Sequence, residues 1–373
     1  MGAHAPLAGL RILELAGIGP GPFCGMMLAD HGAEVIRVER PNASSLTERE
    51  RDPLLRSRRS ITLDLKDPAA VAAVRRLAAT CDGLIEGFRP GVMERLGLGP
   101  DVLLGDNPKL VYGRMTGWGQ TGPLAPEPGH DINYVAISGA LHAFGEAGRR
   151  PVPPINLAGD FGGGGMFLAF GMLAAILQAQ ATGQGQVVDC AMTEGSSVLM
   201  SMMWGFRAMG RWSDKRGTNL LDGGAHFYDT YEAADGKWLA VGAIEPPFYA
   251  ALRTVMGLND GEWDAQFAPA MWPRLKAELT RRFAERTRDE WVAAFAGHEA
   301  CVAPVLDFDE AVAHPHNVAR QSFVTAGGVT QPAPAPRYSL SGTTSPRMAG
   351  AAEGRAILTE AGFDEDEIAA LGQ

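Results

Sequence analysis

Three ionisable residues lie in unusual local sequences and supply the groups needed to move a proton on and off carbon. His130 lies in GHDINY (129–134), Asp160 lies just before four glycines, and Glu245 precedes two prolines. An imidazole gives or takes a proton near neutral pH, and a carboxylate bonded to it stabilises its protonated form. The residue types therefore indicate acid–base chemistry. Structural roles remain the alternative: a hydrogen-bonding histidine, a helix N-cap aspartate and a surface glutamate.

The segments around these residues resemble the α-methylacyl-CoA racemases, a branch of the class III CoA-transferase family. The resemblance extends from Leu10 to about Pro336, which is nearly the whole chain. It implies that His130 is a catalytic base and that Glu245 is the partner of this histidine. It also implies that Asp160 is the second catalytic group, either as an acid and base or as a nucleophile.

Basic residues follow one another closely in the first quarter of a chain whose net charge is −10. They are Arg37, Arg40, Arg56, Arg58, Arg59 and Lys66, followed by Arg89 and Arg95. One guanidinium group can donate two hydrogen bonds to a phosphate group, so these residues suit the phosphates of coenzyme A. From charge alone, a solvated face balanced by nearby acidic residues is the competing interpretation.

The family resemblance favours coenzyme A binding by this region and by the GHDINY motif. The positions that it implies are Arg40, Leu63, Asp64, Leu65, Lys66, Gly87, Phe88, Arg89, Arg95, Gly129, Asp131, Ile132, Asn133 and Tyr134.

A glycine-rich loop, residues 16–22, follows the first expected strand and opens a helix, as in dinucleotide-binding folds. Its spacing does not fit, because Pro22 occupies the last glycine position of the GxGxxG motif. Pro20 and Pro22 also lack the N–H groups that would bind a pyrophosphate. We therefore interpret the loop as a tight structural turn.

Composition limits the class of protein and its partners. The 373 residues suggest about two domains, and 46% hydrophobic residues are ordinary for a soluble enzyme. The negative charge argues against nucleic acid or an anionic membrane as the main partner. Four separated cysteines without a CxxC pair indicate neither a zinc site nor a disulfide framework. A reducing cytoplasm is the simplest setting for such cysteines. The apolar segment 166–177 is too short to span a bilayer, so we expect a buried helix.

The order of patterns predicts an α/β fold. Apolar strands at 10–15, 34–38, 83–85 and 110–112 alternate with helices at 22–30 and from Asp67-Pro68, which favours a parallel sheet covered on both faces. After about residue 217, a hairpin centred on Asp235-Gly236 and three helices indicate a smaller α+β unit. Residues 327–354 are typical of extended surface chain, and an acidic helical tail follows. A cluster at Met200, Met202, Met203 and Met209 suggests core or dimer packing.

We predict residues 1–195 as the first part of a large α/β CoA-binding domain, 196–217 as a linker helix and 218–300 as the small domain. Residues 301–373 then return to the large domain. The resemblance implies a Rossmann-like large domain built from both chain ends, an inserted small domain and an interlocked homodimer.

The expected activity is α-methylacyl-CoA racemisation by two-base proton transfer, without a metal or organic cofactor and with coenzyme A as part of the substrate. The alternative within the family is a class III CoA-transferase that uses Asp160 as a nucleophile. A non-catalytic acyl-CoA-binding module and a nicotinamide oxidoreductase are alternatives from other classes. The expected partners are an acyl-CoA thioester and a second copy of the chain, not nucleic acid or membrane.

Overall fold

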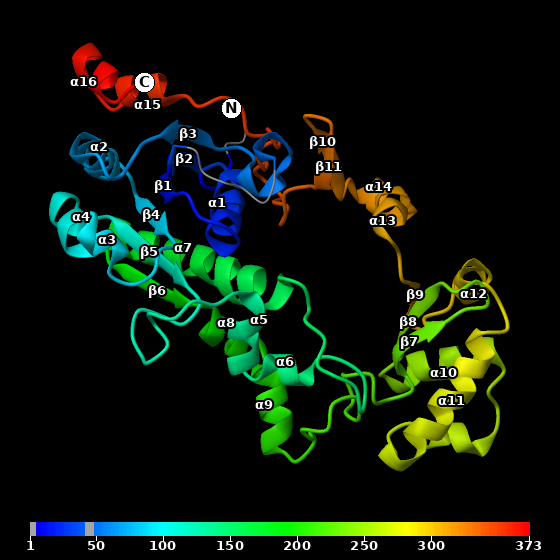
Figure 1. The fold of residues 1–373 in the computed structure, drawn as a ribbon. Coiled ribbons are helices and arrows are strands. Elements are labelled where there is room, and N and C mark those ends of the chain that lie inside the picture. The colour runs from blue at the N-terminus through cyan, green and yellow to red at the C-terminus, as the bar shows by residue number, and fades with distance from the viewer. Residues whose placement is uncertain (1–4, 42–47) are drawn as a thin grey trace. The chain divides into compact units, whose positions relative to one another are not determined.

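A computed structural model of the chain describes residues 5–41 and 48–373 (Figure 1). It divides into two compact units. The larger contains Met1–Ser138, Ile155–Leu199 and Gln321–Gln373, and the smaller contains Gly139–Pro154 and Met200–Arg320. A large α/β unit built from both chain ends with a smaller inserted unit confirms the predicted fold class. The domain boundaries given above stay predictions.

The large unit is built on a six-stranded parallel sheet with the strand order β3-β2-β1-β4-β5-β6. The strands are β1 (Arg11–Leu15), β2 (Glu34–Glu39), β3 (Arg59–Thr62), β4 (Gly83–Glu86), β5 (Val111–Thr116) and β6 (Val187–Ala191). This is the doubly wound order, which reverses direction between β1 and β4. Ligands of such folds bind beyond the carboxyl ends of the strands at that reversal. The sequence patterns had not predicted β3 and β6.

Helices cover both faces of this sheet, and each face has its own hydrophobic core. Side chains alternate along each strand, so Leu13 contributes to one core while Ile12 contributes to the other. The helices that contribute to the first core are α2 (Pro68–Ala78), α3 (Val92–Arg95), α4 (Pro100–Asp106), α15 (Gly354–Glu360) and α16 (Glu365–Ala370). Those that contribute to the second are α1 (Pro20–Asp30), α5 (Asp131–Ile137), α7 (Phe167–Thr182) and, through Met192, α8 (Met192–Leu199). The side chain of Asp67 caps α2, as predicted, by accepting the Ala69 N–H at 2.9 Å.

Three further segments complete the large unit. The π-helix η3 (Leu157–Met166) leads directly into α7, and α8 (Met192–Leu199) packs closely against η3. The hairpin of β10 (Phe323–Ala326) and β11 (Val329–Pro332) begins the return of the chain. Within residues 327–354, which the sequence predicts as extended chain, β11 pairs with β10, and the chain from there to α15 has no regular structure.

The small unit contains the antiparallel sheet β7-β8-β9. Its strands are β7 (Tyr228–Glu232), β8 (Trp238–Gly242) and β9 (Val302–Pro304). Its helices are α6 (Ala140–Ala143), α9 (Ser201–Ala208), α10 (Pro246–Met256), α11 (Trp272–Phe283), α12 (Arg288–Phe295), α13 (Phe308–Ala313) and α14 (Pro315–Arg320). The predicted hairpin is present, and Gly236 takes the positive φ of 74° that its turn requires. No residue of α9 is buried in this chain, so the expectation of core packing for its methionines is wrong.

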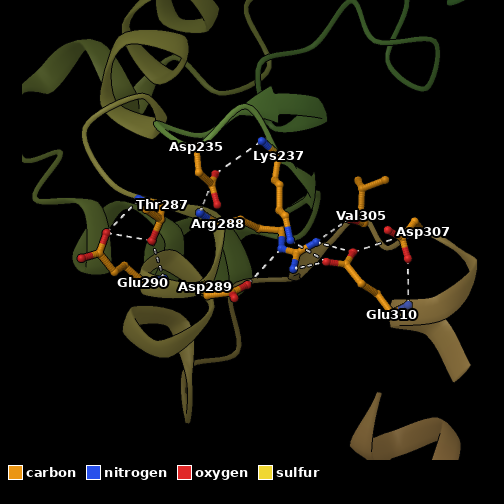
Figure 2. A network of polar contacts seen from close by, with 9 residues as sticks. All are labelled: Asp235, Lys237, Thr287, Arg288, Asp289, Glu290, Val305, Asp307 and Glu310. Atoms are coloured by element: carbon orange, nitrogen blue, oxygen red, sulfur yellow. Dashed lines mark hydrogen bonds and ion pairs between the residues drawn. The ribbon is translucent and has the colours of Figure 1, made fainter. Parts of the chain in front are cut away.

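An ionic network joins three parts of the small unit (Figure 2). Arg288, at the start of α12, is 5% exposed and donates two hydrogen bonds to Glu310 on α13, at 2.7 and 2.9 Å. Lys237 at the edge of β8 reaches the same carboxylate at 2.6 Å. Glu310 also accepts the Asp307 N–H while Asp307 accepts the Glu310 N–H, which forms a capping box. The network therefore fixes the start of α13 to the hairpin.

The long apolar helical stretch differs from its prediction. Leu157–Thr182 is continuous over 26 residues, which is long and apolar enough to cross a membrane by length and composition, although core helices pass the same test. Its α7 part is only partly buried. Leu168 and Met172 are fully buried, whereas Phe170 is 74% exposed and Leu177 is 68% exposed. A spacing of seven residues places these two exposed side chains on one face of α7.

Candidate active site

A cavity of about 690 Å³ lies in the large unit beyond the carboxyl ends of β1, β4 and β5. Loops that follow these strands form its walls together with the starts of α1 and α5 and with Asp160 of η3. The structure brings nine of the predicted site residues to this cavity: Arg40, Gly87, Phe88, Arg89, Gly129, His130, Asn133, Tyr134 and Asp160. The position agrees with the rule for doubly wound sheets.

His130 is placed by the first turn of α5, where it is the N-cap residue with an extended backbone. Its backbone N–H donates to Asn133 Oδ1 at 3.1 Å, while its side chain remains exposed. The adjacent Tyr134 hydroxyl donates to the Gly129 carbonyl, and the Tyr134 ring packs edge-on against Trp118 with centroids 4.7 Å apart. The GHDINY motif thus forms a braced turn that presents the imidazole at the cavity.

Asp160 is not a helix N-cap, because the glycine run is itself helical and forms η3 around it. The glycines permit close packing of backbones: a Cβ on Gly163 would lie 2.6 Å from the Ser196 nitrogen of α8, and one on Gly165 would lie 2.7 Å from the Phe23 ring of α1. Gly19, with φ of 69°, faces the carboxyl group, since a Cβ there would lie 2.8 Å from Asp160 Oδ2. Small residues on two sides therefore set the position of this carboxyl group.

The polar surroundings of the Asp160 carboxyl group are unusual. Asn156, one helical turn earlier, donates its Nδ2–H to Asp160 Oδ2 at 2.7 Å. Burial is the main cause that raises the pKa of Asp160, and the negative Asp131 raises it further; the Asn156 hydrogen bond and the positive form of His130 act in the opposite direction. A raised pKa suits a group that must hold a proton and then release it.

Asp131, which is not among the residues that line the cavity, contacts the same segment. It is 7% exposed, and its Oδ1 accepts the backbone N–H of Asp160 at 2.7 Å. The Gly159 N–H also donates to this carboxylate. Backbone N–H groups near Asp160 would suit donation to an enolate oxygen. These two groups are not available for that role, because Asp131 already accepts their hydrogen bonds.

Three arginines of the basic stretch are buried and bonded to carboxylates instead of lining the cavity. Arg37 and Arg58 both bond to the fully buried Glu14, with Arg58 Nε at 2.9 Å, and Arg56 Nε bonds to Asp30 at 2.9 Å. Removing one partner of a buried pair leaves an uncompensated charge, so these guanidinium groups are committed to the fold. Arg59 is likewise shared among Glu34, Glu353 and Glu360.

The remaining predicted coenzyme A positions lie outside the cavity lining. Leu63 is 2% exposed and belongs to the core, with Leu65 packed against it. Asp64, Lys66 and Arg95 are exposed. Ile132 is 44% exposed on α5. Binding of coenzyme A by these positions stays a prediction.

A buried ion-pair network that sequence reasoning missed supports the loop 87–89 beside the cavity. Glu86, fully buried at the end of β4, accepts the Phe88 N–H at 2.8 Å and the Nε–H of Arg114 at 2.9 Å. Arg114 also bonds to Glu94 at 2.8 Å. Burial raises the pKa of Glu86 to about 7 despite these bonds. Glu86 therefore holds in place the loop that carries Arg89.

Glu245 belongs to the small unit. It is exposed and immediately precedes α10, without a side-chain hydrogen bond to the helix start. Pro246 and Pro247 fix the direction of the backbone after it. Its pairing with His130 stays a prediction. Among residues 5–41 and 48–373, no group of three or more His, Cys, Asp or Glu side chains could hold a metal ion.

Comparison with known proteins identifies relatives along the full chain. The chain is 47% identical to the α-methylacyl-CoA racemase of Mus musculus over 369 residues, which cover 98% of this chain and 96% of the mouse protein. It is also 47% identical to the Homo sapiens protein of the same name, over 88% of this chain and 86% of the human one. A solved CAIB/BAIF family protein from Brucella suis superposes with a TM-score of 0.83 at 27% identity, covering 96% of this chain and all of that one. The model of CoA-transferase family III matches residues 7–352, and the chain belongs to this family.

Proposed function

We propose that the protein is an α-methylacyl-CoA racemase that interconverts the (R)- and (S)-forms of 2-methylacyl-CoA thioesters. The observation that carries this proposal is the shared cavity of His130 and Asp160, which Arg40 and Arg89 also line. Two proton-transfer groups thus meet two cations suited to the phosphates of coenzyme A. The names of the two relatives at 47% identity support the racemase over a transferase.

The proposed reaction exchanges one proton at the carbon beside the thioester. Either His130 or Asp160 removes the α-proton, the thioester becomes an enolate, and the other group delivers a proton to the opposite face. The raised pKa of Asp160 favours this exchange, because its carboxyl group can hold the proton between the two steps. Arg40 and Arg89 are free of this chemistry and bind the nucleotide end of the substrate. We expect no metal or organic cofactor to take part.

We further propose that the active protein is a cytoplasmic homodimer in which the small unit of one chain brings Glu245 to His130 of its partner. Support comes from the exposed apolar side chains of α7, Phe170 and Leu177, and from α9, which buries no residue in the single chain. Sedimentation at low micromolar concentration should give a dimer. A fully active monomer would contradict the proposal.

The test of the activity uses one enantiomer of a 2-methylacyl-CoA in D2O without any acceptor acid. We expect inversion of configuration together with uptake of one deuterium at the α-carbon. Chiral separation measures the inversion, and mass spectrometry measures the deuterium. A CoA-transferase would leave the substrate unchanged until a carboxylic acid is added, and it would then move the CoA group. Transfer to an added acid without inversion would contradict the racemase proposal.

A further inference from the structure

Asp131 is a buried carboxylate that has no cation beside it among the described residues. Its side chain, in a residue that is 7% exposed, accepts the N–H groups of Asp160 and Gly159, and it forms no ion pair within the described ranges 5–41 and 48–373. Burial raises its pKa, and the two backbone donors favour its charged form. A buried charge of this kind costs free energy. Its position beside a second carboxyl group therefore needs an explanation other than stability.

The groups around Asp160 allow the influence of Asp131 to be isolated. Three residues at the start of α5 interact electrostatically with the Asp160 carboxyl group: His130, Asp131 and Tyr134. Asn156, at the start of η3, donates a hydrogen bond to it. Arg40 and Arg89 line the same cavity as Asp160. Among the described residues of the other packed elements, the Arg114 side chain of β5 bonds to Glu86 and Glu94, and Asp189 of β6 accepts the Gln120 N–H. Glu194 of α8 is exposed, and Gly19, the residue before α1, has no side chain.

We propose that Asp131 is a positioning residue that fixes the Asp160 backbone and places a second negative charge beside its carboxyl group, so that Asp160 retains a proton more readily. Two carboxylates that share a site resist being ionised together. Asn156 acts in the opposite sense, because its amide donor favours the ionised form of Asp160. Asp131 thus raises the proton affinity of Asp160, and Asn156 lowers it. The catalytic consequence rests on the proposed racemase function, whereas the electrostatic coupling does not.

Two substitutions separate positioning by charge from a purely structural role. Asp131→Asn keeps an oxygen that can accept the Asp160 N–H but removes the charge, and Asn156→Ala removes the donor. The midpoint of Asp160 ionisation should move to lower pH in Asp131→Asn and to higher pH in Asn156→Ala. Asp101→Asn, at an exposed aspartate in the first turn of α4, should leave the midpoint unchanged. A structural role alone would not shift the midpoint in opposite directions.

The measurement is a pH titration of the intact protein labelled with 13C at the aspartate carboxyl carbons. Asp160→Asn assigns the Asp160 resonance by its disappearance. Coupling is reciprocal, so the Asp131 midpoint should also fall in Asp160→Asn. This second reading holds even if Asp131→Asn does not fold. An unchanged Asp160 midpoint in folded Asp131→Asn, or an unchanged Asp131 midpoint in Asp160→Asn, would overturn the proposal.

Activity then tests the consequence for the reaction. The limb of the kcat/KM–pH profile that reports Asp160 should move to lower pH in Asp131→Asn, in step with the titration. If the wild-type protein inverts no substrate, the proposed function fails while the titration still tests the coupling. If the titration shifts but the limb does not, Asp160 does not control that limb and the catalytic part of the inference is wrong.

Discussion

Glu310 in the small unit and Asp160 in the large unit are carboxylates in opposite surroundings. Glu310 lies between Arg288 and Lys237, and these cations hold its pKa far below the ordinary value (Figure 2). Asp160 has a neutral amide on one oxygen and a second carboxylate close by, and its pKa is raised. One group stays charged at every ordinary pH, whereas the other can change its protonation state.

The difference distinguishes carboxylates that stabilise the fold from carboxyl groups that could transfer a proton. A carboxylate bonded to two cations and a helix start holds elements together, and it cannot readily accept a proton. Asp160 can accept a proton more readily, because its half-buried carboxyl group lies at a cavity near an exposed histidine and a second acid. Burial alone does not decide the matter, because fully buried Glu14 and Asp30 bind arginines and are part of the framework.

The largest effect should come from Asp160→Asn, which removes the titrating group while retaining its shape. We expect inversion to fall by about 100- to 10,000-fold, the usual contribution of a general acid or base. The thermal midpoint should change little, because the Asn side chain retains an oxygen that can accept the Asn156 hydrogen bond. A chiral assay and a melting curve check these outcomes. Near-normal inversion would place Asp160 with the carboxylates that stabilise the fold.

A smaller effect is expected at Arg40, which lines the cavity. Arg40→Ala should raise KM by about tenfold, or about 1.4 kcal/mol, with little change in kcat, because nucleotide binding is shared by the ground and transition states. Arg75→Ala is the matched control, since Arg75 pairs with Asp106 at 2.8 Å outside the cavity. Steady-state kinetics at two salt concentrations would measure both. An unchanged KM without salt dependence would contradict the assignment of Arg40.

A substitution in the small unit should change stability without changing proton transfer. Glu310→Gln should lower the thermal midpoint by a few degrees, because Arg288 and Lys237 lose their shared acceptor. The proton-transfer groups are unchanged, so the Asp160 ionisation midpoint should stay the same. Asp309→Asn, at the exposed neighbour on the same helical turn, should not alter the melting curve. A loss of stability equal in both variants would mean that the ionic network is not the cause.

Glu86 combines features of both regions, since it is fully buried yet bonded to Arg114. Its pKa is raised from 4.5 to about 7, so the folded chain binds its proton more tightly than the unfolded chain does. The free energy of unfolding should therefore fall as the pH rises from about 4.5 to 7, and Glu86→Gln should flatten this dependence. Urea unfolding across that range provides the measurement. Glu94→Gln, which changes the other Arg114 partner, should not flatten it, because the pKa of Glu94 is lowered instead.

Local patterns predicted much of the fold for a physical reason. The strands at 10–15 and 34–38 are short apolar runs bounded by turns, and their alternation with helices admits few arrangements besides a parallel sheet. Strand β3 was missed because Arg59 begins it and the stretch before it is strongly charged. The carboxylates that neutralise Arg59, such as Glu34 and Glu360, lie far from it in the sequence.

The candidate site was predictable to the extent that its residues lie in continuous motifs. His130 and Asp160 could be found from GHDINY and the glycine run, whereas the roles of Arg56 and Arg58 could not, because their carboxylates Asp30 and Glu14 come from other elements. Asn156 was within reach of sequence reasoning. It lies four residues before Asp160, and that spacing joins side chains once the glycine run is taken as helical.

We propose that His130 and Asp160 act on opposite faces of one enolate. The most direct test is the washout of deuterium from each α-deuterated enantiomer in H2O, using His130→Ala and Asp160→Ala. Each variant should lose deuterium from one enantiomer only, and the two variants should prefer opposite enantiomers. Equal washout from both enantiomers in either variant would mean that one group serves both faces, and the two-base account would be wrong.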